Sequence, residues 1–328
     1  MKKIKLISST ATIFIILFSV FDAYTQENIA NKVWTNGDIE YTVNSKNNIL
    51  YFYGINRHEG GWGFSVKTQS NGKMTISDMQ DDKIVYSYPK EYTDGTIEYK
   101  QLNSQEILII KDNNDKLIDI FTVGKLNDML ISSLVNYLAG SYTDSSGKNY
   151  VFDSNNTRVS GFGNIENYVI NVKYYVPDFI ISFGENTHYL ITRERSENSV
   201  RMRFEPCIKN KENEWEPVKN AKSIVITKKT WTSYVTNTKT SGRYPFTSLK
   251  VLTRGELIVY TNSELDIMRN EIFARYGQKF KTARYRDYFN TQSWYKAQID
   301  DATSELTEIE KLNLQQILAV QEYFRMAN

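Results

Sequence analysis

The chain has 328 residues and nearly balanced charge, with 40 Lys and Arg against 38 Asp and Glu. Because it has neither a large net excess nor a dense cluster of basic residues, a nucleic-acid partner is not expected. One cysteine, Cys207, and two histidines exclude an intramolecular disulfide, a His-rich zinc site and a Cys-X-X-Cys site, and no cofactor is expected.

The first 25 residues have the pattern of a bacterial secretory signal peptide. Lys2, Lys3 and Lys5 precede an uninterrupted run of apolar and small residues at 11–21. This run is shorter than the ~20 residues that cross a bilayer as a helix, so a retained anchor is the weaker alternative. We expect cleavage after Thr25 and an exported mature protein without an integral membrane segment.

Residues 26–125 are predicted to form a β-rich domain, because short stretches of alternating apolar and polar residues are separated by turn residues. Asp94-Gly95 is predicted to be a hairpin turn between residues 85–86 and 97–99. A second hairpin turn is predicted at 113–115. About eight strands are expected, which suits a small barrel or a sandwich.

Residues 126–138 are predicted to form a connecting helix, since their apolar residues recur at helical spacing and Gly140 follows. Alternation of period two then returns, and residues 139–229 are predicted to form a second β-rich domain. Gly184 opens one of its predicted turns. The overall expectation is an α+β protein with two consecutive antiparallel barrels or sandwiches followed by a small helical domain.

The two predicted β domains begin alike. Trp34 and Tyr41 in the first correspond to Tyr142 and Tyr150 in the second at nearly constant offset. A weak internal duplication is therefore predicted. The opening of the second domain, residues 138–153, also resembles lipocalin-like bacterial β domains.

Residues 230–243, rich in Thr, Ser, Asn and Lys, are predicted to be a linker, and residues 244–328 a separate helical domain. One helix is expected at 264–276, with Ser263 and Asp266 as its capping box and Gly277 as its left-handed stop. A last helix is expected at 308–324, opened by Thr307.

The C-terminal segment resembles the YARHG family, named for a central Tyr-Ala-Arg-His-Gly. Here this pentapeptide is Phe-Ala-Arg-Tyr-Gly at 273–277, so two of its five positions depart. The resemblance covers about 244–324 and implies an extracellular module with no assigned biochemical activity. The candidate site residues, with a structural or binding role, are Arg269, Asn270, Glu271, Phe273, Ala274, Arg275, Tyr276, Gly277, Trp294 and Tyr295.

Three charged residues of the motif helix carry the main structural hypothesis. Arg269 falls close to the apolar stripe of this helix and is predicted to be buried and ion-paired. Glu271 and Arg275 are one turn apart and are predicted to pair on its flank. A fold-stabilising network is favoured over a ligand-facing role, and Trp294 with Tyr295 is favoured as core over a stacking platform.

The sequence shows no nucleophile elbow, phosphate loop or other catalytic motif, so catalytic residues stay unassigned. The favoured function is a non-catalytic periplasmic or cell-surface protein that binds a protein, a glycan or another cell-envelope ligand. Two alternatives stay open: a hydrolase of cell-envelope polymer that uses an Asp/Glu pair, and a β-barrel that binds an apolar ligand.

Overall fold

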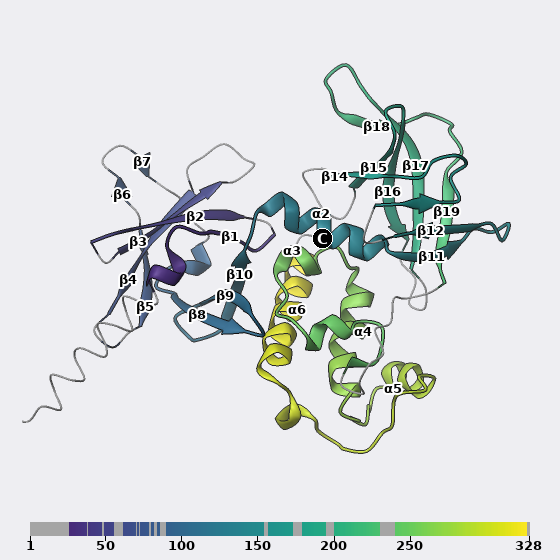
Figure 1. The fold of residues 1–328 in the computed structure, drawn as a ribbon. Helices are drawn as coiled ribbons and strands as arrows, with labels where there is room; N and C mark the ends of the chain where they lie inside the picture. The colour runs from purple at the N-terminus through teal and green to yellow at the C-terminus, as the bar shows by residue number, and fades with distance from the viewer. Residues whose placement is uncertain are drawn as a thin grey trace, which may run out of the picture. The chain divides into compact units, whose positions relative to one another are not determined.

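The structure is a computed structural model, and its chain divides into two compact units, Met1–Lys125 and Leu126–Asn328 (Figure 1). The predicted signal peptide lies outside the described residues. No helix in the described part of the chain is both long and apolar enough to span a membrane. The structure describes residues 26–37, 39–47, 49–55, 62–69, 71, 73–78, 80–81, 84–85, 90–153, 157–172, 179–194, 200–229 and 240–326.

The first unit is a closed antiparallel barrel, which confirms the predicted β-rich domain and decides for a barrel over a sandwich. It closes because β1 pairs with both β2 and β10. A separate two-stranded hairpin is formed by β6 (Gln80–Asp81) and β7 (Ile84–Val85), and η1 (Lys90–Tyr92) precedes β8. The barrel strands are β1 (Val33–Thr35), β2 (Glu40–Lys46), β3 (Ile49–Ile55), β4 (Trp62–Thr68), β5 (Met74–Asp78), β8 (Thr96–Leu102), β9 (Gln105–Lys111) and β10 (Leu117–Val123).

Aromatic side chains fill the described interior of this barrel. The Tyr41 ring lies 5.2 Å from Phe64 and 5.5 Å from Phe121, and Phe52 stacks on Phe64 at 4.6 Å. Such packing gains both burial and edge-to-face contacts. A filled core of this kind does not favour an apolar ligand inside the first barrel.

The predicted turn at Asp94-Gly95 exists, but the hairpin around it was wrong. β8 pairs with β5 and β9 and not with residues 84–85. Asp94 has φ +56°, and a Cβ on Gly95 would lie 2.6 Å from the carbonyl oxygen of Lys111, so the glycine is required by close backbone approach. The turn at 113–115 joins β9 to β10 as predicted, with Asp115 at φ +64°.

The second unit begins with α2 (Leu126–Leu138), which has the predicted bounds, and continues into an antiparallel sheet. Backbone hydrogen bonds of 2.8 and 2.9 Å join residues 157–159, at the β13 end of the sheet, to residues 166–168, at the β14 end. The sheet therefore curls into a half-barrel. Its strands are β11 (Gly140–Thr143), β12 (Asn149–Phe152), β13 (Val159–Ser160), β14 (Val169–Val172), β15 (Phe179–Phe183), β16 (Thr187–Glu194), β17 (Arg201–Lys209), β18 (Trp215–Pro217) and β19 (Ile224–Lys228).

The first hairpins of the two units share one feature. Trp34 is the cross-strand partner of Tyr41, and Tyr142 is the partner of Tyr150. Trp34 and Tyr142 are both fully buried. The residues that suggested the duplication thus occupy equivalent register positions, although duplication itself stays a prediction, as does the lipocalin-like resemblance.

The C-terminal helices of the second unit lie within the predicted helical segment, residues 244–328. α4 begins at Asn262 because Thr261 and Glu264 form its capping box, so the prediction of Ser263 and Asp266 was wrong. Thr307 and Glu310 cap α6 as predicted, and α3 and α5 were not predicted. The elements are η3 (Pro245–Ser248), α3 (Arg254–Leu257), α4 (Asn262–Ala274), α5 (Ala283–Asn290), η4 (Thr303–Glu305) and α6 (Glu308–Met326).

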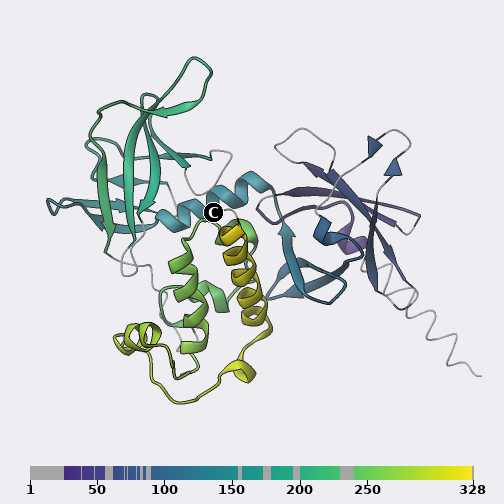
Figure 2. The ribbon, with the colours of Figure 1, turned by 180° about the vertical axis from the view of Figure 1, so that it is seen from behind.

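One continuous core joins the half-barrel and the helices through α2. The ring of Tyr137 on α2 lies 5.3 Å from that of Tyr260, and the Thr253 hydroxyl lies 3.1 Å from the sulfur of Met129. Figure 2 shows α4 and α6 side by side from behind, and α3 contacts both α2 and α6. Independent folding of residues 244–328 stays a prediction, but their core extends beyond the predicted linker.

Candidate functional site

A buried ion pair lies at the C-terminal end of the motif helix α4, where Arg275 is the C-cap residue. The Arg275 guanidinium Nη2 lies 2.6 Å from a carboxylate oxygen of Glu271, and the two side chains are 0 and 1% exposed. The predicted pairing is confirmed, but the pair lies in the interior and not on a flank of the helix. An interior pair is stable only if every remaining donor and acceptor is also satisfied.

The other donors of Arg275 all point at the segment that precedes α3. Nε donates to the carbonyl oxygen of Ser241 at 2.7 Å, and Nη2 also donates to that of Tyr244 at 2.7 Å. Nη1 donates to the hydroxyls of Thr247 and Ser248 at 2.8 and 2.9 Å. Its five N–H groups therefore meet five acceptors, which is the full capacity of a guanidinium.

Glu271 holds the same segment from the other side. Its carboxylate accepts the backbone N–H groups of Arg243 and Tyr244 at 2.7 and 2.6 Å. Burial raises the pKa of this carboxyl, while Arg275 and the two backbone donors oppose the rise. The approach is so close that a Cβ on Gly242, at φ +111°, would lie 2.3 Å from the carboxylate carbon.

Arg269 is not the buried arginine, so the prediction of its burial was wrong, whereas the predicted ion pair is present, with Asp266. Its side chain is 28% exposed and lies 3.5 Å from Asp266 and 3.4 Å from the side-chain oxygen of Gln321 on α6. Asn270 donates to the carbonyl oxygen of Asp266 at 2.8 Å. α6 covers the apolar stripe but leaves its edge open, so Arg269 reaches solvent.

The end of the motif connects α4 to α6. The Tyr276 hydroxyl donates to Glu310 at 2.7 Å, and the Ser248 hydroxyl donates to the other oxygen of Glu310 at 2.5 Å. Gly277 has φ +78°, and a Cβ there would lie 2.7 Å from the carbonyl oxygen of Lys296. Phe273 is partly buried and Ala274 is buried against the core.

Trp294 and Tyr295 belong to a small aromatic cluster beside α5. Their rings lie 6.1 and 5.7 Å from Phe289, and Phe289 stacks on Phe280 at 4.8 Å. The Tyr295 hydroxyl donates to the carbonyl oxygen of Gln278 at 2.6 Å. These contacts are those of a packed core.

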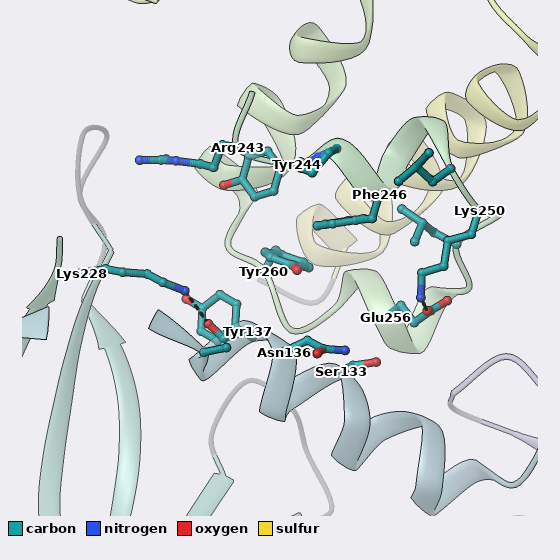
Figure 3. A pocket seen from close by; sticks show the side chains of 14 residues that line it. Ser133, Asn136, Tyr137, Lys228, Arg243, Tyr244, Phe246, Lys250, Glu256 and Tyr260 are labelled. Carbon is teal, nitrogen blue, oxygen red and sulfur yellow. Dashed lines mark hydrogen bonds and ion pairs between the residues drawn. The ribbon is translucent and has the colours of Figure 1, made fainter. Parts of the chain in front are cut away.

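A cavity of about 290 Å³ lies away from the motif helix, between α2, the end of β19 and the segment that precedes α4 (Figure 3). None of the ten candidate site residues lines it. Its lining comes from three distant stretches of sequence, which local periodicity does not connect. The lining residues are Ser133, Asn136, Tyr137, Ala139, Lys228, Arg243, Tyr244, Pro245, Phe246, Leu249, Lys250, Leu252, Glu256 and Tyr260.

Aromatic rings form one wall of the cavity. Tyr260 lies 5.8 Å from Tyr244 in an edge contact and stacks on Phe246 at 6.1 Å, and Tyr137 meets Tyr260 from α2. Burial raises the pKa of Tyr137, Tyr244 and Tyr260, so these side chains stay neutral phenols at physiological pH.

Two basic side chains, Lys228 and Arg243, line the cavity. In Figure 3 the Lys228 amine points toward Tyr137, and the Arg243 side chain extends away from the aromatic rings. The Lys228 amine donates to the carbonyl oxygen of Tyr137 at 2.8 Å. Burial lowers the pKa of Lys228 to about 7; Glu264 opposes this and Arg243 adds to it. A third basic side chain, Lys250, pairs with Glu256 at 2.5 Å and is half exposed.

Within the described ranges, no three His, Cys, Asp or Glu side chains are grouped so as to hold a metal ion. No curated protein and no solved structure matches the chain. A family model, that of the YARHG domain, matches residues 244–322. The C-terminal part of this chain is therefore a YARHG domain, as the motif residues predicted.

Proposed function

We propose that this is an exported, non-catalytic binding protein whose second unit binds a small anionic ligand with a flat apolar body. The observation that carries this proposal is the cavity that combines tyrosine and phenylalanine walls with Lys228 and Arg243. Ligand sites are typically concave and apolar, with a few polar groups that fix orientation.

The chemistry of the lining defines the ligand class. The rings of Tyr137, Phe246 and Tyr260 offer flat apolar surface, which suits an aromatic or otherwise planar body. Arg243 presents a planar guanidinium suited to a carboxylate, sulfonate or phosphate. The volume of about 290 Å³ is at the small end for ligand sites and suits a small molecule or the end of a larger polymer.

The hydrolase alternative gains no support from this cavity. Of the residues that line it, Glu256 is the single carboxylate, and it is paired with Lys250. An acid pair of the glycosidase type needs two carboxyl groups across one cleft. The binding hypothesis is thus the one that the described residues favour.

The proposal can be tested with 8-anilinonaphthalene-1-sulfonate, a probe with a flat naphthalene ring and one negative charge, titrated into the folded protein and followed by fluorescence. Asn136→Trp places an indole at an exposed position on the cavity wall, and Arg243→Met removes the guanidinium. We expect each change to weaken binding about tenfold or more, the effect of losing roughly 1.4 kcal/mol.

Asn290→Trp is the matched control, because Asn290 is an exposed helix residue on α5 outside the cavity. It should bind the probe like the parent, and all variants should melt at the parent temperature, since the probe also binds loosely folded states. Parent-like binding by Asn136→Trp and Arg243→Met, or no saturable binding at all, would contradict the proposal.

Export rests on the sequence of residues 1–25 and on the YARHG domain. The expected mature N-terminus is Gln26. Intact-mass analysis of the protein recovered outside the cytoplasm measures this directly. Retention of Met1, or a protein that stays with membranes after an alkaline wash, would refute export by signal cleavage.

A further inference from the structure

We propose that the Lys228 side-chain amine forms a reversible imine with the carbonyl group of an anionic aldehyde or keto acid bound in the cavity. This inference rests on the proposed binding function, because it names the chemical class of ligand for the same site. It adds a covalent step that simple binding does not need.

The position of Lys228 supports this role. It is the last residue of β19, and its side chain passes into the cavity lining with only 8% of the residue exposed. Its nitrogen lies 5.9 and 5.5 Å from the ring centroids of Tyr137 and Tyr142. Figure 3 shows the hydrogen bond that it donates to the carbonyl oxygen of Tyr137. The amine is therefore held at a fixed place against an apolar wall.

The surroundings also keep much of the amine uncharged. Desolvation is the main cause, the positive charge of Arg243 acts in the same direction, and Glu264 on α4 acts against both. Desolvation and a neighbouring cation are the two ways in which proteins activate a lysine as a nucleophile. With a pKa of about 7, roughly half of the Lys228 side chains are neutral at neutral pH.

The reaction balances with the ligand and one proton from solvent water. The amine nitrogen attacks the carbonyl carbon, and the nitrogen passes a proton to the oxygen, which gives a carbinolamine. The hydroxyl takes up the solvent proton and leaves as water, which breaks the C–O bond and leaves a protonated C=N bond, with no change in oxidation state. The protonated imine keeps one N–H, which can continue to donate to the carbonyl oxygen of Tyr137.

Arg243 accounts for the anionic part of the ligand. It lines the same cavity as Lys228, and a guanidinium binds a carboxylate or phosphate through two parallel hydrogen bonds. A carbonyl compound with a negatively charged group could thus place its carbonyl carbon at Lys228 and its anion at Arg243. Lys250, exposed and paired with Glu256, offers no comparable environment for an amine.

The test is reductive trapping in the full mature chain. The protein is incubated at pH 7 with pyridoxal 5′-phosphate, an aromatic aldehyde with an anionic group, and then treated with sodium borohydride. Peptide mapping by mass spectrometry gives the labelling rate at each lysine. We expect Lys228 to be labelled at least tenfold faster than Lys250, because an ordinary lysine is only about one part in 10³ neutral at pH 7.

Lys228→Arg should lose this fast adduct, whereas Lys250→Arg should keep it. If Lys228→Arg fails to fold, the test uses the parent protein alone, and the labelling rate at Lys228 is measured as a function of pH. We expect this rate to rise with a midpoint near pH 7. Labelling that follows surface exposure, with Lys228 no faster than Lys250, would overturn the imine proposal. Retained binding of anilinonaphthalene sulfonate in that case would leave the binding function standing.

Discussion

The guanidinium of Arg275 lies 2.6 Å from the carboxylate of Glu271, one turn earlier on α4. Together they bind the backbone of residues 241–244 and the hydroxyls of Thr247 and Ser248. This pair links the motif helix to the segment that also supplies Arg243, Tyr244 and Phe246 to the cavity. The YARHG motif thus holds in place a segment that lines the cavity, although no residue of the motif lines the cavity itself.

Arg275→Ala should lower the free energy of unfolding by about 3–5 kcal/mol, because it leaves the buried Glu271 carboxylate without its cationic partner. Arg275→Lys should not restore the parent value, since an ammonium cannot reach five acceptors in one plane. Denaturant unfolding of the second unit gives the free energy of unfolding of the parent and of both variants.

Arg269→Ala is the control on the same helix. Its side chain is partly solvated, so truncation should cost less than about 1 kcal/mol. Equal losses at the two positions would contradict the assignment of Arg275 as the buried arginine.

Gly242→Ala should destabilise the second unit by more than Gly147→Ala. Both glycines have positive φ, +111° and +83°, and alanine pays roughly 1–2 kcal/mol for this conformation. At Gly242 the new Cβ would also clash with the Glu271 carboxylate, which cannot move because three hydrogen bonds fix it. At Gly147 the Cβ enters open space. Thermal melts that shift equally would refute this account of the clash.

Stability of the second unit should increase with pH between about 7 and 9 because of Lys228. Its pKa is about 7 when folded and near 10.5 when unfolded, so the unfolded chain binds more protons in this range. This gain in stability is lost as the pH falls to 7. The free energy of unfolding changes by at most about 1.4 kcal/mol per pH unit. Lys228→Met should flatten the profile in urea melts, and an equal slope in both proteins would argue against a neutral buried lysine.

Tyr276→Phe removes the hydroxyl that donates to Glu310 but keeps the ring. We expect a loss of about 1.5–3 kcal/mol, the usual value for a hydrogen bond to a charged acceptor. The helix cap of α6 should survive, because Thr307 still donates its backbone N–H to Glu310 at 2.9 Å. Circular dichroism during urea unfolding reports both the free energy of unfolding and the helix content. An unchanged midpoint would show that this hydrogen bond adds nothing to stability.

A fragment of residues 126–328 should melt at a higher temperature than one of residues 244–328. The shorter fragment retains the caps of α4 and α6 but exposes the core side chains that pack on α2, such as Tyr260. Calorimetry of the two fragments compares them directly. A cooperative melt of the shorter fragment at the same temperature would show that the helical segment is an independent domain.

The sequence by itself determined the local structure and the identity of the C-terminal domain. The helix at 126–138, the turns at 113–115 and 184–186 and the stop at Gly277 follow from periodicity and turn chemistry within a few residues. The motif at 269–277 carried enough ordered residues to identify the YARHG domain.

Only the tertiary structure decided which charged residue is buried and where the cavity lies. Arg269 and Arg275 flank the apolar stripe of α4 on opposite sides, about 120° apart around the helix. Which of them is buried depends on residues 241–248, which bind Arg275, and on α6, which leaves Arg269 partly exposed. Lys228 became a candidate nucleophile because α2 and Arg243 surround it, although they are distant in sequence. Desolvation is set by all the atoms near a group, so a pattern read along the chain cannot give it.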